Sequence, residues 1–288
     1  MNEACPLGTI NLPNEIRHPK AKSNPMVLAK PDNCPVLEAF QLHGHVAAVT
    51  GGSRGIGIEV VRGLAEAGAD VALIYTSAKD AEENAEKISK ECNVRCHAFK
   101  SDVSDPALIK KTLQDVASHF GRLDIVVANA GVASHIEMLD YTYEQYRHIM
   151  GINQDGAFFT AQAAGEIFKR QGHGNLIFTA SVSARLVNLP QRQAAYNASK
   201  AAVVHLAKCL AVEWVDFCRV NCVSPGFIST DMIDFLPEDW KKEWLRMTPG
   251  QRFCDTYELK GVYVFLASKA SSYMTGHDVV VDGGYTLP

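Results

Sequence analysis

The amino-acid sequence predicts a single α/β domain with a doubly wound parallel sheet, preceded by an extended arm. From Val46 onward, short apolar runs alternate with longer amphipathic runs, and the connections between them are short. This alternation is typical of parallel strands that are covered by helices on both faces. A glycine cluster follows the first apolar run, and six of the twelve prolines lie within the first 35 residues.

Composition restricts the class of protein. The 288 residues are 47% hydrophobic and 21% charged, which suits one large domain with a well-buried core. The net charge of -4 creates no field that would attract nucleic acid or an anionic membrane. No apolar run approaches the roughly 20 residues that cross a bilayer, and residues 1–10 lack a secretory signal pattern. We therefore expect a cytoplasmic protein with a small-molecule substrate.

The eight cysteines include no Cys-x-x-Cys pair, and no histidine-rich segment accompanies them. We therefore expect reduced thiols and no metal site.

Residues 1–41 are predicted to form an extended, proline-rich arm, and residues 42–288 the domain. Proline fixes φ and lacks a backbone donor, so such a density of prolines opposes regular structure. The sequence leaves open whether the arm wraps its own domain or a neighbouring subunit.

Seven strands are expected, each short, apolar and often β-branched, as strands buried on both faces should be. They are Val46–Thr50, Val71–Tyr75, Arg95–Phe99, Ile125–Ala128, Leu176–Thr179, Val220–Val223 and Val279–Val281. Helices are expected between them, at Ile56–Ala67, Ala81–Lys90, Ala107–Phe120, Glu144–Arg170 and Tyr196–Phe217.

The glycine cluster lies between the first predicted strand and the first predicted helix. Glycine lets the backbone turn sharply and approach a pyrophosphate, and a helix N-terminus offers free N–H groups at the positive end of its dipole. The strand–loop–helix setting distinguishes the cluster from an ordinary tight turn. It predicts a Rossmann-type sheet that binds a dinucleotide through Gly51, Ser53, Arg54, Gly55, Ile56 and Gly57.

The second predicted strand indicates which dinucleotide is bound. NAD-binding folds usually place an acidic residue at its end, on the ribose 2′-hydroxyl. Here the segment is Tyr75-Thr76-Ser77, which has no acid to repel a 2′-phosphate. Thr76 and Ser77 can donate hydrogen bonds to a phosphate, and Arg54 can pair with it. The sequence therefore favours NADP(H), although Arg54 as a solvated surface cation is the alternative.

Tyr196 and Lys200 form the candidate catalytic pair. Reduction of a carbonyl by a nicotinamide requires a proton donor for the oxygen. A free tyrosine has a pKa near 10, and a neighbouring cation lowers that value. Residues four apart face the same side of a helix, so we expect the Lys200 ammonium near the Tyr196 hydroxyl.

These motifs together resemble the short-chain dehydrogenase/reductase family. The glycine spacing Thr-Gly-x-x-x-Gly-x-Gly and the Tyr-x-x-x-Lys pair carry the resemblance, which covers about Leu42 to Pro288. Asn188-Leu189-Pro190-Gln191 and the ending Val281–Thr286 resemble a fungal subgroup of sorbose reductase-like, mannitol or xylulose dehydrogenase-like and carbonyl reductases.

The resemblance implies further roles and a homotetramer. Asn153 matches the family's helical asparagine, which holds a water in a proton relay, and a helix-packing amide is the alternative. Ala128 stands where the family's first asparagine is expected. Besides Tyr196 and Lys200, the residues implied to contact the cofactor are Asp102, Val103, Asn129, Ala130, Gly131, Pro225, Gly226, Ile228 and Thr230.

Two serines compete for the position beside Tyr196. The commonest family spacing, thirteen residues, selects Ser183. Alignment of the strand end selects Ser181, and we favour it because strand ends are rigid while loops vary in length.

On the substrate side, residues 231–253 mix aromatic and charged residues, which predicts an amphipathic lid. An oligomer-facing helix is the alternative. An apolar lid weakly favours a bulky ketone over a free polyol. The predicted pocket residues are Ser183, His135, Val187, Gln193, Phe227, Met232 and Phe235.

The sequence thus predicts an NADPH-dependent carbonyl reductase. A polyol or sugar dehydrogenase and a repurposed NADP-binding protein are the alternatives.

Overall fold

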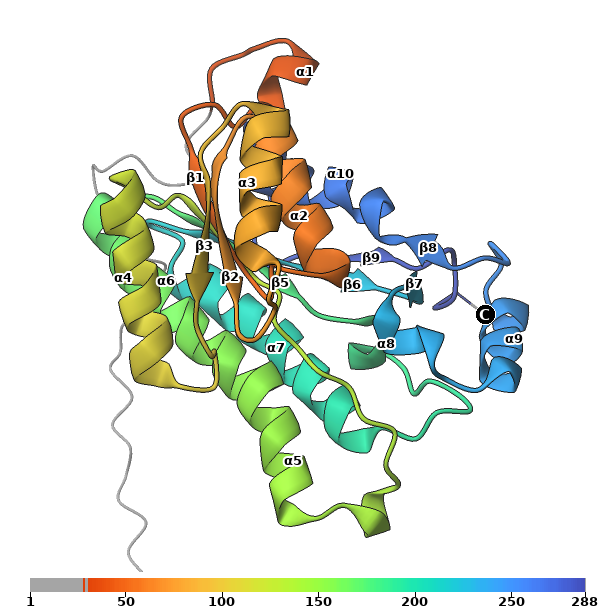
Figure 1. Ribbon diagram of the computed structural model, residues 1–288. Coiled ribbons are helices and arrows are strands. Elements are labelled where there is room, and N and C mark those ends of the chain that lie inside the picture. The colour runs from red at the N-terminus through yellow and green to blue at the C-terminus, as the bar shows by residue number, and fades with distance from the viewer. Residues whose placement is uncertain (1–27, 29–30, 288) are drawn as a thin grey trace, which may run out of the picture.

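Seven parallel strands form one sheet in the computed structural model. The structure describes Leu28 and residues 31–287, except for the side chains of Met232 and Asp234. Their order is β3-β2-β1-β4-β5-β6-β9 (Figure 1). The bounds are β1 Val46–Thr50, β2 Asp70–Tyr75, β3 Cys96–Lys100, β4 Ile125–Ala128, β5 Asn175–Thr179, β6 Arg219–Pro225 and β9 Asp278–Val281. The predicted doubly wound parallel sheet is confirmed, and each predicted strand matches one of these within a few residues.

Two hydrophobic cores lie on the two faces of the sheet. One face is covered by α2 (Gly55–Glu66), α3 (Ala81–Cys92) and α10 (Lys260–Ala267). The other is covered by α4 (Pro106–Phe120), α6 (Gly156–Gln171) and α7 (Ala194–Glu213). The strands are buried between these layers, which explains why they are apolar without alternation.

The strand order reverses between β1 and β4, which are neighbours although two strands separate them in sequence. Connections leave the sheet in opposite directions at such a point and open a crevice at the carboxyl ends of the strands. The loop after β1 and the loop after β4 both lie there. The fold therefore brings the glycine cluster and the Asn129-Ala130-Gly131 segment together.

The helix predicted over Glu144–Arg170 is interrupted. It consists of α5 (Tyr143–Met150), a π-helical turn η2 (Gly151–Asp155) and α6. π-helical turns inside α-helices are frequent at functional sites. This one contains the buried Asn153, and the apolar period on which the prediction relied cannot reveal one extra residue in a turn.

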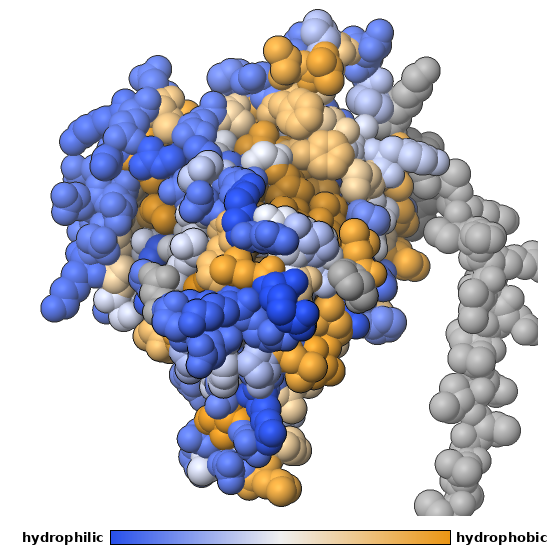
Figure 2. Space-filling view, turned by 90° about the vertical axis from the view of Figure 1, so that its right-hand side faces the viewer, coloured by the Kyte–Doolittle hydropathy of each residue, from blue (hydrophilic) through white to orange (hydrophobic). Residues whose placement is uncertain are grey.

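The predicted lid forms two helices, α8 (Asp231–Asp234) and α9 (Glu238–Met247). It lies between two short paired strands, β7 (Ile228–Ser229) and β8 (Cys254–Asp255). Figure 2 looks onto this side of the molecule and shows a hydrophilic outer surface over the lid. Trp244 of the lid is fully buried and lines the pocket beneath it, whereas Phe235 is exposed.

The remaining elements are short. They are α1 (Val36–Ala39) and the turns η1 (Met138–Asp140), η3 (Val182–Ala184), η4 (Thr256–Leu259) and η5 (Lys269–Ser271). The helix α1 lies in the predicted extended arm, and the Phe40 ring after it lies 6.0 Å from that of Phe265. Residues 1–27, 29 and 30 of that arm lie outside the described residues. No helix in the described part of the chain is long and apolar enough to cross a membrane.

Candidate active site

The glycine cluster has the conformation that a phosphate loop needs. Gly51 and Gly55 have φ of +62° and +54°, a region that other residues rarely adopt. A Cβ on Gly57 would lie 2.0 Å from the Gly51 carbonyl oxygen, so only glycine fits there. The helix α2 starts at Gly55 with no side-chain cap and no acidic residue in its first turn. Its amino end is therefore available to an anion.

A polar clamp joins this loop to the end of β4. The Thr50 hydroxyl accepts hydrogen bonds from the backbone N–H groups of Asn129 (3.0 Å) and Ala130 (3.1 Å). The Asn129 amide donates to the carbonyl oxygens of Thr50 and Gly51, and Thr179 donates to the Asn129 oxygen at 3.1 Å. The clamp fixes the floor of the crevice across three strands.

The end of β2 offers fewer phosphate donors than the sequence predicted. The Thr76 hydroxyl donates to the Ser101 carbonyl oxygen at 3.0 Å, so its proton is already used. Ser77 and Arg54 remain exposed, and the Arg54 side chain makes no ion pair or hydrogen bond with any residue that the structure describes. No acid lies at Tyr75–Ser77 to repel a 2′-phosphate.

The Ser101-Asp102-Val103 segment is held in a turn at the end of β3. The Asp102 carboxylate accepts hydrogen bonds from the N–H (2.9 Å) and the hydroxyl (2.7 Å) of Ser104. Val103 is buried against α6, where a Cβ on Gly156 would lie 2.7 Å from it. Both residues thus shape the crevice wall, and the Ser101 hydroxyl is buried without a partner in the described chain.

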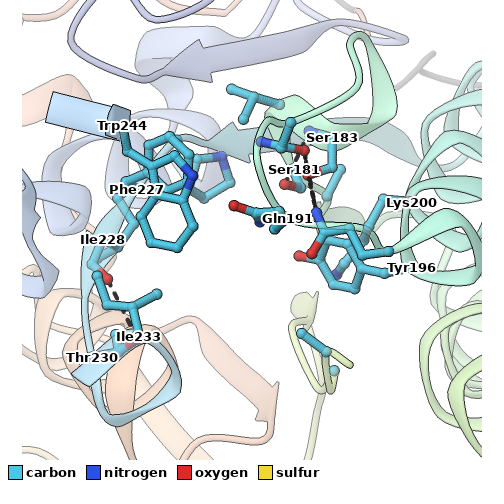
Figure 3. Close-up of a pocket in the computed structure, with 18 of the residues that line it drawn as sticks. Ser181, Ser183, Gln191, Tyr196, Lys200, Phe227, Ile228, Thr230, Ile233 and Trp244 are labelled. Carbon is cyan, nitrogen blue, oxygen red and sulfur yellow. Dashed lines mark hydrogen bonds between the residues drawn. The ribbon is translucent and has the colours of Figure 1, made fainter. Parts of the chain in front are cut away.

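Tyr196, Lys200 and Ser181 meet at one wall of a pocket, beside the end of β5 (Figure 3). The Lys200 ammonium lies 5.8 Å from the centre of the Tyr196 ring and donates to the Thr179 carbonyl oxygen at 2.8 Å. The Ser181 hydroxyl hydrogen-bonds with the Tyr196 side chain. The helix α7 and the end of β5 therefore bring the three predicted side chains together.

The electrostatics of this pair differ from the sequence expectation. Burial raises the pKa of the Tyr196 phenol above its ordinary value, and the hydrogen bond from Ser181 only partly opposes this. Burial also lowers the pKa of the Lys200 ammonium to about 8. Removal of both groups from water disfavours their charged forms, and this is the largest effect on each pKa. The predicted lowering of the Tyr196 pKa by Lys200 is therefore not seen in this structure.

The second serine has a different set of partners. The Ser183 hydroxyl donates to the Asn188 amide oxygen at 2.5 Å and accepts from Gln193 at 3.3 Å. Its backbone N–H donates to the Ser181 hydroxyl oxygen at 3.1 Å. The structure thus places Ser181 at Tyr196, and Ser183 in a network that supports the loop after η3.

Asn153 occupies the π-helical turn behind Lys200. Its amide oxygen accepts from the Val132 N–H at 2.8 Å, and its amide nitrogen donates to the Val132 carbonyl and the Ser199 hydroxyl. A Cβ on Gly131 would lie 3.4 Å from both the Asn153 oxygen and the Lys200 nitrogen. Asn153 therefore packs the loop after β4 against α7, and its oxygen retains one lone pair able to accept from a water.

The opposite wall of the pocket comes from the loop after β6 and from the lid. Phe227 stacks on the fully buried Trp244 with ring centres 4.5 Å apart, and Tyr285 packs edge-on against Phe227 at 4.8 Å. The predicted residues that line the pocket are Ile56, Gly131, His135, Ser181, Ser183, Gln193, Tyr196, Lys200, Pro225, Gly226, Phe227, Ile228 and Thr230.

Two predicted pocket residues lie elsewhere. Val187 is 75% exposed and Phe235 is 77% exposed, and neither lines the pocket. Val187 lies on the outer side of its loop, and the lid directs Ile233 and Leu236 inward in place of Phe235. The side chain of Met232 lies outside the described part of the chain.

Sequence reasoning missed several lining residues, of which Gln191 and Asn188 are the most polar. They lie in a loop with no periodic pattern, so only the resemblance of Asn188–Gln191 to a fungal subgroup pointed to them. Trp244 was predicted only as a member of the lid.

Comparisons with known proteins agree with this geometry. The family model described as enoyl-(acyl carrier protein) reductase matches residues 51–286. The chain belongs to the short-chain dehydrogenase/reductase family. It is accordingly an oxidoreductase, as the sequence predicted.

Three relatives show the range of this part of the family. A probable NADP-dependent mannitol dehydrogenase of Yarrowia lipolytica is 46% identical over 255 residues, which are 88% of this chain and 91% of the relative. A sorbose reductase of Candida albicans is 45% identical over 92% of this chain and 97% of its own. The solved structure of an NADPH-dependent 3-quinuclidinone reductase from Rhodotorula rubra is 39% identical, with a TM-score of 0.85. The alignment covers 94% of this chain and all of that one.

Proposed function

We propose that this protein interconverts a ketose and the corresponding sugar alcohol, with NADP(H) as the hydride carrier and Tyr196 as the general acid or base. The observation that carries the proposal is the meeting of Ser181, Tyr196 and Lys200 beside the crevice that begins at the glycine loop. The mannitol dehydrogenase and sorbose reductase names of the relatives support the substrate class.

The crevice fits a phosphorylated dinucleotide. The uncapped amino end of α2 and the left-handed Gly51 and Gly55 suit a pyrophosphate, and the exposed Arg54 suits a 2′-phosphate. The NADP named for the mannitol dehydrogenases supports the same choice. When bound, NADPH supplies a hydride from its nicotinamide ring.

The side chains at the pocket wall then transfer a proton to the substrate oxygen. A substrate oxygen placed beside both hydroxyls would replace the Tyr196 oxygen as the acceptor of the Ser181 proton, while the Ser181 oxygen continues to accept the Ser183 N–H. Tyr196, kept protonated by its raised pKa, donates its proton to the same oxygen as charge develops there. Lys200 stabilises the phenolate that remains, and Asn153 holds the backbone beside Lys200.

We also propose that the protein is cytoplasmic and assembles as a homotetramer. The exposed rings of Tyr146 on α5 and Phe158 on α6 supply apolar surface for subunit contact.

A second candidate is a reductase of bulky ketones. The stacked Phe227 and Trp244 give one pocket wall an aromatic character, and the 3-quinuclidinone reductase is a structural relative. Oxidation of NADPH, followed by absorbance, with sorbose and with bicyclic or aryl ketones separates the two. Turnover of the bulky ketones alone would replace the sugar proposal.

Cofactor selection provides one test. Arg54→Ala should raise the Kd of NADPH about 10- to 100-fold, the usual effect of losing a hydrogen-bonded ion pair, while the Kd of NADH changes little. Fluorescence titration measures both constants. Arg62→Ala, which removes an arginine within α2 that pairs with Glu91, is the matched control. Equal weakening of NADPH and NADH would contradict a phosphate contact.

The pH profile provides another test. The Lys200 pKa of about 8 means that the ammonium is lost as pH rises through 8, so kcat for ketone reduction should be flat below that pH and fall above it. The unfolded lysine keeps its ordinary pKa of 10.5. Between pH 8 and 10.5 the unfolded chain therefore binds the extra proton, and this group makes the fold more stable as pH rises. A loss of stability caused by Lys200 therefore cannot explain a fall in kcat above pH 8. A profile that stays flat to pH 10 would exclude a role for the ammonium.

A further inference from the structure

Two buried polar atoms at the pocket lack hydrogen-bond partners among the described residues: the indole nitrogen Nε1 of Trp244 and the amide oxygen Oε1 of Gln191. We propose that they form a pair that binds a substrate hydroxyl away from the reacting carbon, and that this pair selects hydroxylated ketones over plain ones. The inference rests on the proposed function, which supplies the reaction but not these residues.

The burial of both side chains makes the missing partners informative. Trp244 is 0% exposed and Gln191 is 8% exposed. Buried polar atoms in folded proteins are nearly always paired, because an unpaired one loses its hydrogen bonds to water without replacement. Two such atoms lining one pocket indicate that the partner is a molecule that enters it.

The surroundings argue against a poorly paired loop. The other polar side chains of the same loop are joined to one another: Gln193 donates to both Ser183 and Asn188, and Ser183 donates to Asn188. The hydroxyl of Tyr285 hydrogen-bonds to this loop as well, at Leu189 and Asn188. Most polar side chains of this loop therefore have hydrogen-bond partners, and the Gln191 amide oxygen is an exception.

The Trp244 ring cannot readily turn toward another partner. It stacks on Phe227 with an angle of 14° between the ring planes and packs edge-on against Phe253 and Trp240. Contacts on several sides hold the indole plane, so the direction of its N–H is set by packing. A group that accepts this hydrogen bond must therefore come to the indole.

The chemistry of the two atoms specifies the ligand group. An indole N–H only donates and an amide oxygen only accepts, whereas a hydroxyl does both. A substrate hydroxyl that reaches both atoms would satisfy them together, which a carbonyl or ether oxygen would not. A third unpaired atom, Nδ1 of the pocket residue His135, offers a second contact. Burial lowers the His135 pKa, which keeps the ring neutral and able to donate or accept.

The position of the pair separates it from the reacting oxygen. Figure 3 shows Trp244 on the wall opposite Tyr196, Lys200 and Ser181, with Gln191 between the two walls. The reacting oxygen belongs at Tyr196 and Ser181, so the recognised hydroxyl is on another carbon of the substrate. Acyclic sugars carry such hydroxyls, and simple ketones do not.

The test compares Trp244→Phe, which keeps an aromatic ring, and Gln191→Met, which keeps the length of the side chain, with the wild type. The substrates are sorbose and 2-hexanone, which has the same number of carbons but no hydroxyl. We expect kcat/KM for sorbose to fall about 10- to 100-fold in each variant, while that for 2-hexanone stays within about threefold. The double variant should lose less than the product of the two single losses, because one hydroxyl serves both atoms.

The controls are Trp214→Phe, directly after α7 and outside the pocket lining, and Gln162→Met, on the exposed side of α6. Both should leave the preference for sorbose unchanged. NADPH affinity, measured by fluorescence, verifies that each variant is folded.

Three results would overturn the inference. An equal fall for sorbose and 2-hexanone means that the pair only supports packing. Unchanged kinetics means that water satisfies the two atoms. Both results leave the proposed function standing. A wild-type enzyme that turns over neither sorbose nor a sugar alcohol, in contrast, contradicts the proposed function itself and the inference with it.

Discussion

Replacement of Tyr196 by phenylalanine should lower kcat for ketone reduction by about two to four orders of magnitude, the usual contribution of a positioned general acid. Phenylalanine keeps the ring that lies 5.8 Å from the Lys200 nitrogen and removes only the hydroxyl. NADPH affinity should therefore change little. Initial rates with sorbose and a fluorescence titration of NADPH measure the two quantities.

Tyr273→Phe is the matched control, because Tyr273 is an exposed tyrosine after η5, outside the pocket lining. It should retain the wild-type rate. If Tyr196→Phe kept more than a tenth of the wild-type kcat, the assignment of the proton donor would be wrong. A loss of NADPH affinity in parallel with kcat would instead point to damage of the crevice.

Alanine substitutions of Ser181 and Ser183 should have different effects on the kinetics. Ser181→Ala should lower kcat by about two to three orders of magnitude, since it removes a hydrogen-bond donor aimed at the oxygen where charge develops. Ser183→Ala removes the hydroxyl that donates to Asn188 and should cost less than about tenfold, mostly in KM, by loosening the loop. Steady-state kinetics of both variants with the same ketone provides the comparison.

If Ser183→Ala lowered kcat more than Ser181→Ala, Ser183 would be the serine that contacts the substrate oxygen. The common family spacing, and not the alignment of the strand end, would then locate it correctly. This result would also place the substrate oxygen nearer the Asn188 loop than Tyr196. The loop could then not serve as the support that its hydrogen bonds suggest.

The sequence predicted the elements of the sheet well, for a physical reason. Strands buried on both faces must be apolar throughout, so Val46–Thr50 and Ile125–Ala128 are recognisable without any contact information. The glycine loop was equally clear, because positive φ at Gly51 and Gly55 and the close approach at Gly57 leave no other residue type possible.

The pocket was harder to predict, because it is built from loops and from a lid whose inward face depends on packing. Phe235 and Ile233 are two residues apart and equally apolar, and nothing local indicates that Ile233 lines the pocket while Phe235 faces solvent. Likewise, the Tyr196–Lys200 spacing is visible in the sequence. The burial that sets the pKa directions of both groups is a property of the assembled fold.

The π-helical turn at Gly151–Asp155 has a consequence for how the long connection between β4 and β5 is organised. One additional residue in a helical turn rotates everything beyond it by about 100° relative to what came before. The apolar stripe of α5 and that of α6 are therefore out of phase, and each helix can face a different neighbour. Deletion of a single residue here would restore one continuous phase and swing the Asn153 amide away from Val132. The segment therefore cannot lose or gain even one residue, although none of its side chains has to contact the substrate.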